Sequence, residues 1–338
     1  MRAPLVPRPL APSLDELVAG ASRREPLVAG DAKSGAALER VEILGQTFVV
    51  KHLHPDDDFT MRGFGDLCCR PVEVWTCGLL DAMPTCIDHA VVGAARGFGR
   101  NRWGAALLLR DVGPHLIPEG DDPVPLAVHR QLIDHLAELA ATFWEPAPGW
   151  LPELLSLESR YSAFGPGWIA AEAALGFPVP VPRIAAEGWT SFATRAPKDV
   201  ATLIDDLRHD LDPLVAALRT TPQTFLHGDW KMGNLGAHGD RTVLLDWTYP
   251  GIGPVGHDLG WYLAINRARI PEPKGAVIDA LRTALNRRGI DTDGWWDTQV
   301  DLCLLGTLVQ FGWEKALGDD DELGWWCERA RAGAGHLP

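Results

Sequence analysis

The chain has 338 residues, of which 46% are hydrophobic and 22% are charged. This balance is typical of a globular protein and argues against disorder, and the length suffices for a large single domain or two lobes. The formal net charge of −14 argues against general attraction to a polyanion such as DNA or to an acidic membrane, so we expect neither partner. The same charge would favour a cationic small molecule, although acidity also serves solubility alone.

The cysteines and the apolar segments indicate a cytoplasmic protein. None of the six cysteines forms a Cys-x-x-Cys pair, and no Cys/His spacing suggests zinc, so we expect reduced thiols. The first ten residues contain no apolar stretch long enough for a signal peptide. The longest apolar run, 302–313, contains polar residues and is too short to span a bilayer.

The first third of the sequence predicts a short helix followed by strands. Ser13 and Glu16 form a capping-box pattern at the start of the helix. Strand-like alternation follows in residues 38–44 and 47–51, and two further strand-like runs lie later in the chain, at 87–95 and 103–109.

A loop of small residues, 28–36, precedes the first of these strands. It contains Ser34 and Gly35, and small side chains would let its backbone N–H groups approach phosphate oxygens. The loop has only two glycines and no Gly-x-Gly-x-x-Gly pattern, so an ordinary surface turn fits it as well.

From Val124 onward the hydrophobic residues recur at helical spacing, first over 124–143 and again over 198–220. The intervening segment is rich in proline and glycine around 164–182, which suggests short helices and loops that would form part of a substrate wall. The C-terminal part is helical and rich in tryptophan. We interpret most of these tryptophans as core residues, and an aromatic box for a quaternary ammonium group is the alternative.

The stretch 225–247 carries the sharpest functional pattern. Two short β-rich runs flank a polar loop with Asp229, Lys231 and Asn234, and Asp246 ends the second run. Phosphoryl transfer requires this set: one carboxylate accepts the hydroxyl proton, an amide and a second carboxylate hold a divalent metal, and a cation neutralises the transferred group. Hard oxygen ligands suit Mg²⁺ better than zinc. The alternative interpretation is a hairpin with a polar tip.

A His-Gly-Asp-x-x-x-x-Asn pattern begins at His227, and the pair Asp246-Trp247 follows later. With these two motifs the chain resembles the aminoglycoside phosphotransferase and choline kinase family, a branch of the protein-kinase-like fold. The resemblance extends from about Ala29 to the C-terminal helices and is sharp between residues 225 and 263. It implies an α+β, bilobal protein-kinase-like fold.

The resemblance also implies how the chain is divided. Residues 1–111 would form a small N-lobe with an antiparallel sheet, and residues 112–338 a larger, mostly helical C-lobe with the catalytic loop at 225–247 and the acceptor site. ATP would lie in the cleft between the two lobes.

The roles in the C-lobe follow from the same resemblance. Asp229 would orient or deprotonate the acceptor hydroxyl, and Lys231 would neutralise the γ-phosphate. Asn234 and Asp246 would bind Mg²⁺. We interpret His227 as a residue that holds the loop rather than as a second base.

In the N-lobe, Lys51 ends a Val-Val strand just after the flexible loop, as does the kinase lysine that holds the α/β-phosphates. An edge-strand lysine that reaches solvent is the alternative. Glu73 on the following helix would orient Lys51, and Asp66 is its competitor for this role. Leu109 and Asp111 fall in the hinge, whose backbone reads the adenine edge in the resembled family.

Two departures from the protein-kinase pattern matter. Trp247-Thr248 replaces Phe-Gly, so a Phe-flip switch is not expected, and the loop at 30–35 lacks the usual glycines. Only a dozen residues separate Asp246 from Asp258, which is too short for a protein-substrate platform and favours a small-molecule acceptor. Asp258 itself is interpreted as the N-cap of the next helix.

The acceptor stays open at this level: an aminoglycoside-like or other antibiotic, an amino sugar or a choline-like alcohol would each fit. A role in antibiotic resistance, the preference for ATP over GTP and the oligomeric state stay open as well. A catalytically silent nucleotide-binding pseudokinase is the alternative from another class, and a structural protein that uses its Trp-rich end is a third interpretation.

Overall fold

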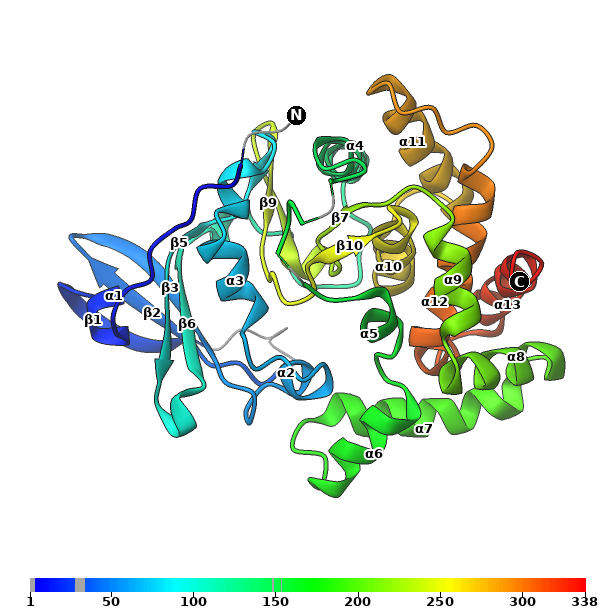
Figure 1. Cartoon of the computed structure of the whole chain (residues 1–338), viewed down its shortest axis with the longest axis horizontal. Helices are drawn as coiled ribbons and strands as arrows, with labels where there is room; N and C mark the ends of the chain where they lie inside the picture. Colours follow the sequence, from blue (N-terminus) through cyan, green and yellow to red (C-terminus); the bar gives the residue numbers. More distant parts are fainter. Residues whose placement is uncertain (1–3, 28–33, 148, 153) are drawn as a thin grey trace.

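The computed structural model describes residues 4–27, 34–147, 149–152 and 154–338. A five-stranded antiparallel sheet forms the N-terminal part, and helices dominate the rest (Figure 1). In spatial order the strands of this sheet are β1 (Ala21–Leu27), β2 (Leu38–Ile43), β3 (Gln46–Leu53), β6 (Gly104–Arg110) and β5 (Val91–Phe98). The predicted α+β class is confirmed.

The two faces of the sheet have different neighbours. Val50 is fully buried in a small core with Leu17, at the end of helix α1 (Leu14–Leu17). Since successive side chains of a strand point to opposite faces, Lys51 points to the other face. That face is covered by α3 (Arg70–Thr76), which packs on β5 and β6 (Figure 1). The strand pattern therefore directs the lysine into the molecule.

The predicted short first helix and its Ser13 cap are confirmed, because the Ser13 side chain accepts a hydrogen bond from the Glu16 amide at 3.1 Å. The predicted strand at 87–95 is wrong in its extent. It divides into β4 (Ile87–Asp88) and β5, with Ala90 at a φ of 57° between them, and β4 pairs with β9 (Arg241–Leu244) instead of joining the large sheet.

The helical pattern at 124–143 forms α4 (Leu126–Thr142), as expected. The pattern at 198–220 forms two helices, α8 (Lys198–His209) and α9 (Asp212–Arg219). The break has a local cause: Asp210 is extended, and Pro213 in the first turn of α9 has no N–H to continue a helix from α8.

In the helical part, the buried helix α12 packs against α13, α10 and α7. Most of the predicted core tryptophans are buried around it, including Trp296, Trp313 and Trp326. The helices not yet bounded are α2 (Phe59–Gly63), α5 (Leu157–Tyr161), α6 (Pro166–Ala174), α7 (Pro180–Arg195), α10 (Gly256–Asn266), α11 (Lys274–Arg287), α12 (Trp296–Lys315) and α13 (Asp320–Ala334). The short 3₁₀ helices are η1 (Leu79–Ala82), η2 (Arg100–Arg102), η3 (Gly113–His115), η4 (Met232–Asn234) and η5 (Arg267–Arg269).

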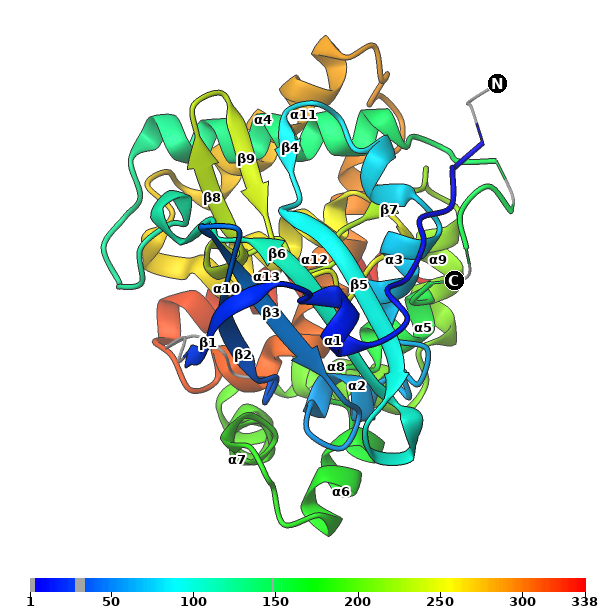
Figure 2. The same cartoon turned by 90° about the vertical axis from the view of Figure 1, so that its left-hand side faces the viewer.

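Two small sheets flank the polar loop of the stretch 225–247 (Figures 1 and 2). One pairs β7 (Thr224–Leu226) with β10 (Gly251–Gly253), and the other contains β8 (Leu235–His238), β9 and β4. The polar loop lies between β7 and β8, and Asp246 follows β9. Within the described ranges, none of the helices has the length and apolar character needed to cross a bilayer.

Candidate active site

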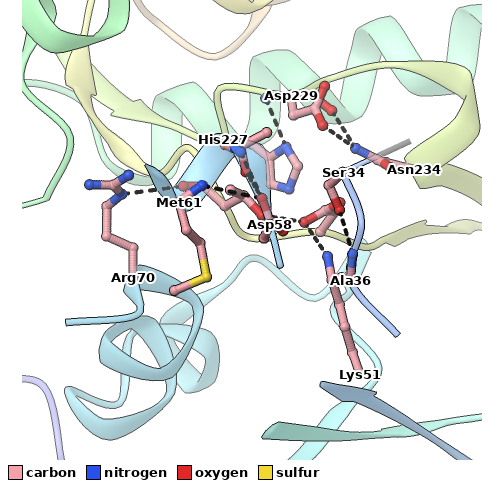
Figure 3. A network of polar contacts seen from close by, with 12 residues as sticks. Ser34, Ala36, Lys51, Asp58, Met61, Arg70, His227, Asp229 and Asn234 are labelled. Atoms are coloured by element: carbon pink, nitrogen blue, oxygen red, sulfur yellow. Dashed lines mark hydrogen bonds and ion pairs between the residues drawn. The ribbon is translucent and has the colours of Figure 1, made fainter. Parts of the chain in front are cut away.

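Asp229 lies in the loop between β7 and η4 and is only 2% exposed. Its Oδ2 accepts a hydrogen bond from Asn234 Nδ2 at 2.7 Å and lies 3.3 Å from Lys231 Nζ. Its Oδ1 accepts a hydrogen bond from Trp261 Nε1 at 2.8 Å. Figure 3 shows Asp229 and Asn234 facing each other. Burial raises the pKa of Asp229, and the charge of Lys231 opposes this rise.

Asp258 fixes the backbone of this loop. Its carboxylate accepts hydrogen bonds from the His227 amide at 3.0 Å and the Gly228 amide at 2.8 Å. Gly228 has a φ of +82°, and a side chain there would collide with the Arg160 guanidinium and the Tyr249 carbonyl, so the loop requires glycine. Burial raises the pKa of Asp258 to about 6.

The N-cap interpretation of Asp258 is wrong. Helix α10 begins at Gly256 and Val255 is its N-cap, so Asp258 already lies in the first turn and bonds another segment. The predicted holding role of His227 agrees with its position: the ring is fully buried and packs edge-on against Trp247. Burial lowers the pKa of His227 to about 3, so the imidazole is neutral.

Lys51 and Asp246 connect the sheet to the helical part, since Lys51 Nζ lies 2.7 Å from Asp246 Oδ1. Thr248 Oγ1 donates to the same oxygen. Burial alone would raise the pKa of Asp246, but the charges of Lys51 and Lys231 hold it far below its usual range. Likewise, burial would lower the pKa of Lys51, and the nearby Asp246 raises it. Both side chains are therefore charged.

The predicted pairing of Glu73 with Lys51 is not the one in the structure. Glu73 forms its ion pair with Arg96 on β5, the strand on which α3 packs, so its carboxylate is already paired with another cation. Asp66, the predicted competitor, accepts a hydrogen bond from the Arg70 amide at 2.9 Å at the start of α3. Neither carboxylate is the partner of Lys51 in this arrangement.

Asp58 is a further carboxylate near Lys51. It is 1% exposed, and its Oδ1 caps α2 by accepting from the Thr60 amide at 2.8 Å and the Met61 amide at 3.2 Å. Its Oδ2 is buried and has no hydrogen-bond partner among the described residues. The charge of Asp58 also favours the protonated form of Lys51. Figure 3 shows both residues in one polar network.

The structure describes the end of the predicted phosphate loop, while residues 28–33 lie outside the described residues. The Ser34 carbonyl accepts a hydrogen bond from the Phe59 amide at 3.1 Å, and the Ser34 hydroxyl accepts one from the Ala36 amide at 3.4 Å (Figure 3). Gly35 has a φ of +96°, and a Cβ there would lie 2.2 Å from the Asp57 carbonyl oxygen. The loop is thus tied to α2, near Asp58.

The predicted hinge residues lie where the sheet passes into the helical part. Leu109 is buried on β6 and pairs with Val49. The Asp111 amide donates to the Thr47 carbonyl at 3.3 Å, and its carboxylate accepts from the Gly113 amide at 3.1 Å. The hinge backbone is therefore anchored to β3 on one side and to η3 on the other.

The predicted metal ligands are adjacent. The Asn234 carbonyl accepts a hydrogen bond from the Leu245 amide at 2.9 Å, which brings Asn234 next to the segment that carries Asp246. Asn234 bonds Asp229 through its amide nitrogen, so its side-chain oxygen remains for a metal. No group of three or more His, Cys, Asp or Glu side chains that could hold a metal occurs in the described part of the chain. This donor set fits Mg²⁺, which usually takes one or two protein oxygens and completes its shell with phosphate and water.

Three residues were missed by sequence reasoning: Asp58, Trp261 and Arg160. Asp58 belongs to a run of three aspartates that would suit an exposed turn. Trp261 was grouped with the core, although its N–H bonds Asp229. The Arg160 guanidinium is buried between the Tyr249 carbonyl and His257. One sequence signal could have indicated the role of Trp261. It lies three residues after Asp258, a spacing that places both side chains on the same face of a helix.

Residues 82–292, more than half of the chain, match the model of a family described as APH, phosphotransferase enzyme family. A comparison with curated proteins gave no match.

Solved structures with a similar fold include several kinases. A microcompartment-associated aminopropanol kinase aligns with a TM-score of 0.51 and 13% identity over 94% of this chain and 92% of its own. Choline kinase from Cryptosporidium parvum aligns with a TM-score of 0.49 and 9% identity over 94% of this chain and 89% of its own. A third structure is a thermostable mutant of aminoglycoside phosphotransferase APH(4)-Ia in a complex with ADP and hygromycin B. It aligns with a TM-score of 0.47 and 14% identity over 96% of this chain and 97% of its own. At 13% identity, the likeness to the aminopropanol kinase shows the fold alone.

Proposed function

Because the chain belongs to the phosphotransferase enzyme family and is therefore a small-molecule kinase, we propose that it transfers the γ-phosphate of Mg-ATP to a hydroxyl group of a small acceptor. One observation supports this most strongly: the chain brings a buried carboxylate, Asp229, and a charged pair, Lys51 and Asp246, into one site from distant segments. These are the groups that phosphoryl transfer requires.

In this proposal Asp229 accepts the proton of the acceptor hydroxyl. Its two oxygens are held by Asn234 and Trp261, so the carboxylate is oriented before the acceptor binds. Lys231 faces the γ-phosphate and neutralises charge there. Asn234 and Asp246 hold the metal, and Mg²⁺, when bound, offsets the charge of the phosphates.

The nucleotide would be held by the N-terminal part. Lys51 would contact the α/β-phosphates, with Ser34 and Gly35 at the covering loop and the backbone of Leu109 and Asp111 at the adenine edge. We propose that the boundary between the two lobes lies at residue 111, because the chain leaves the sheet there. The cytoplasmic location stays a prediction from the sequence.

We further propose that Asp58, in place of Glu73, positions Lys51. When Asp246 binds a metal, the Lys51 ammonium needs another anion, and Asp58 has a buried oxygen without a partner among the described residues. Replacing Asp58 with asparagine keeps a good helix cap but removes the charge. The KM for ATP should rise about fivefold, roughly 1 kcal/mol, with a smaller change in kcat.

Glu73→Gln is the matched control for this prediction. Since Glu73 forms its ion pair with Arg96, the variant should keep the KM for ATP of the unmodified protein. Steady-state kinetics at varied ATP concentration measure both variants. If the KM for ATP rises in Glu73→Gln and stays unchanged in Asp58→Asn, then Glu73 and not Asp58 is the partner of Lys51.

The pH dependence tests the coupling of Asp229 and Lys231. Only the ionised Asp229 accepts a proton, so kcat/KM should fall as the pH drops through the pKa of Asp229, which burial places above its usual value. The charge of Lys231 lowers this pKa, so Lys231→Met should move the acid limb of the pH profile to higher pH. Lys198→Met changes an exposed lysine and should leave the limb in place. An acid limb that stays or moves to lower pH in Lys231→Met contradicts the assignment.

The proposed function is tested by Mg²⁺-dependent ADP release with a panel of hydroxylated acceptors: aminoglycosides, other antibiotics, amino sugars and choline. Release above the level of an Asp229→Ala blank supports the proposal. ATP binding with no release for any acceptor supports the alternative, a nucleotide-binding pseudokinase.

A further inference from the structure

A cavity of about 440 Å³ lies between α2 and α6. Figures 1 and 2 show these two helices next to each other, at the lower edge of the molecule. The cavity is thus bounded by the N-terminal part on one side and by the segment 162–175 on the other. Its lining residues that matter for recognition are Arg62, Ser162, Trp168, Glu172, Leu175 and Arg208.

The charges on the cavity wall do not cancel. Arg62 and Glu172 neutralise each other through two hydrogen bonds, Nε to Oε1 at 2.7 Å and NH2 to Oε2 at 2.9 Å. The two hydrogen bonds occupy both carboxylate oxygens of Glu172, whose side chain is 2% exposed. Glu172 is the single carboxylate among the described residues that line the cavity. Arg208 has no carboxylate partner among the described lining residues, so the wall carries one more arginine than carboxylate in a chain whose net charge is −14.

Arg208 is held rigidly but poorly paired. Its guanidinium stacks 3.7 Å above the ring of Trp189, and its side chain is 11% exposed. The nearest carboxylate, that of Asp205, lies 3.9 Å away, beyond hydrogen-bond distance, and Arg208 Nε is buried with no partner among the described residues. A planar guanidinium with spare donors is the usual partner of a carboxylate or phosphate group.

A continuous row of aromatic side chains connects this cavity to the catalytic carboxylate. Trp168, on the cavity wall, lies 5.2 Å from Phe64 between ring centroids, and Phe64 lies 5.3 Å from Tyr249. Tyr249 lies 5.6 Å from Trp261, which bonds Asp229. A flat, apolar body that follows this row would place one end at Asp229 and the other at the cavity.

We propose that the cavity binds an anionic group of the acceptor, with Arg208 as its counter-ion. The acceptor is then a hydroxylated molecule with an aromatic or apolar body and a carboxylate or similar anion at the end away from the reacting hydroxyl. This inference rests on the proposed function, because it places the hydroxyl at Asp229. It reverses the expectation from net charge, since a polycation such as an aminoglycoside would place ammonium groups next to Arg208.

The test uses three probes that share a benzyl alcohol and differ at the para position: 4-(hydroxymethyl)benzoate, 1,4-benzenedimethanol and 4-(hydroxymethyl)benzylamine. Their dissociation constants are measured by ligand-observed NMR on the full chain, with Asp229→Ala beside the unmodified protein. Binding needs no turnover, so a failure here is distinct from a failure of phosphoryl transfer. The benzoate should bind at least about tenfold more tightly than the benzylamine, because it alone completes a charge-assisted pair.

Two variants, each with a matched control, assign this preference to the cavity. Arg208→Gln should remove it, whereas Arg183→Gln, at an exposed arginine of α7 paired with Glu187, should retain it. Ser162→Asp places a carboxylate on the exposed rim of the cavity without disturbing the Arg208 stack, and it should weaken benzoate binding relative to Ser162→Asn.

Equal affinity for the benzoate and the benzylamine, no saturable binding of the benzoate, or a preference that survives both Arg208→Gln and Ser162→Asp would overturn the proposal. A tighter benzylamine would indicate a cationic acceptor instead, and would restore the expectation drawn from the net charge.

Discussion

Replacing Asp229 with alanine should lower kcat by about a thousandfold and change the affinity for Mg-ATP by no more than about threefold. Asp229 is the buried carboxylate of the site that is held by Asn234 and Trp261 and has no bond to Lys51. Its loss therefore removes the proton acceptor for the hydroxyl and leaves the nucleotide contacts of the sheet intact.

Two measurements separate these effects. ADP release with a responding acceptor gives kcat, and titration with ATP in the presence of Mg²⁺ gives the affinity. Asp240→Ala is the matched control, because Asp240 is an exposed aspartate in the turn between β8 and β9. Undiminished turnover in Asp229→Ala, or equal losses in both variants, would remove Asp229 from the mechanism.

Asp246→Ala should have the second large effect, and on binding rather than on proton transfer. Asp246 is both a proposed metal ligand and the anion 2.7 Å from Lys51. Its removal should weaken the binding of Mg-ATP about a hundredfold, or roughly 2.7 kcal/mol. Binding of ATP without metal should change much less, because the Lys51 ammonium is released from its carboxylate and remains available for phosphate.

The test is a series of ATP titrations at increasing Mg²⁺ concentration, for the unmodified chain and for Asp246→Ala. In the variant the dependence on Mg²⁺ should nearly vanish. A thermal melt checks that the variant folds, because a buried lysine without its partner destabilises a protein. A Mg²⁺ dependence identical to that of the unmodified chain would refute the metal assignment.

The loop that we propose to be catalytic was predictable because its residues are close in sequence. Asp229, Lys231 and Asn234 lie within six residues, and the alternating runs on either side predicted the strands that hold them. Lys51 was predictable for the same reason, since alternation along β3 already determines which face it occupies. These local rules sufficed for the fold class and for the local structure around these residues, whose catalytic roles stay a proposal.

Pairing between distant segments was not predictable in this way. Glu73 was expected to pair with Lys51, yet it forms its ion pair with Arg96 on a neighbouring strand. Only the packing of α3 on the sheet determines this pairing. Asp258 had the sequence position of an N-cap, but α10 begins two residues before it. The Asp258 carboxylate instead accepts a hydrogen bond from the Gly228 amide, in the loop that carries Asp229. A side chain's neighbours depend on how elements dock, and one sequence does not specify that directly.

The proposed acceptor site shows the same limit on a larger scale. Net charge suggested a cationic partner, whereas the wall of the cavity between α2 and α6 has an excess arginine, Arg208. Total charge describes the whole surface, and recognition depends on the few groups that line one cavity.

The most direct test of the central claim is ³¹P NMR of Mg-ATP mixed with the protein and the acceptor panel, with Asp229→Ala alongside. Phosphoryl transfer predicts a new phosphate-ester resonance that grows as ADP appears, in the unmodified protein and not in the variant. Saturable ATP binding without an ester or ADP, for every hydroxylated acceptor in the panel, would contradict the account and favour a nucleotide-binding module without turnover.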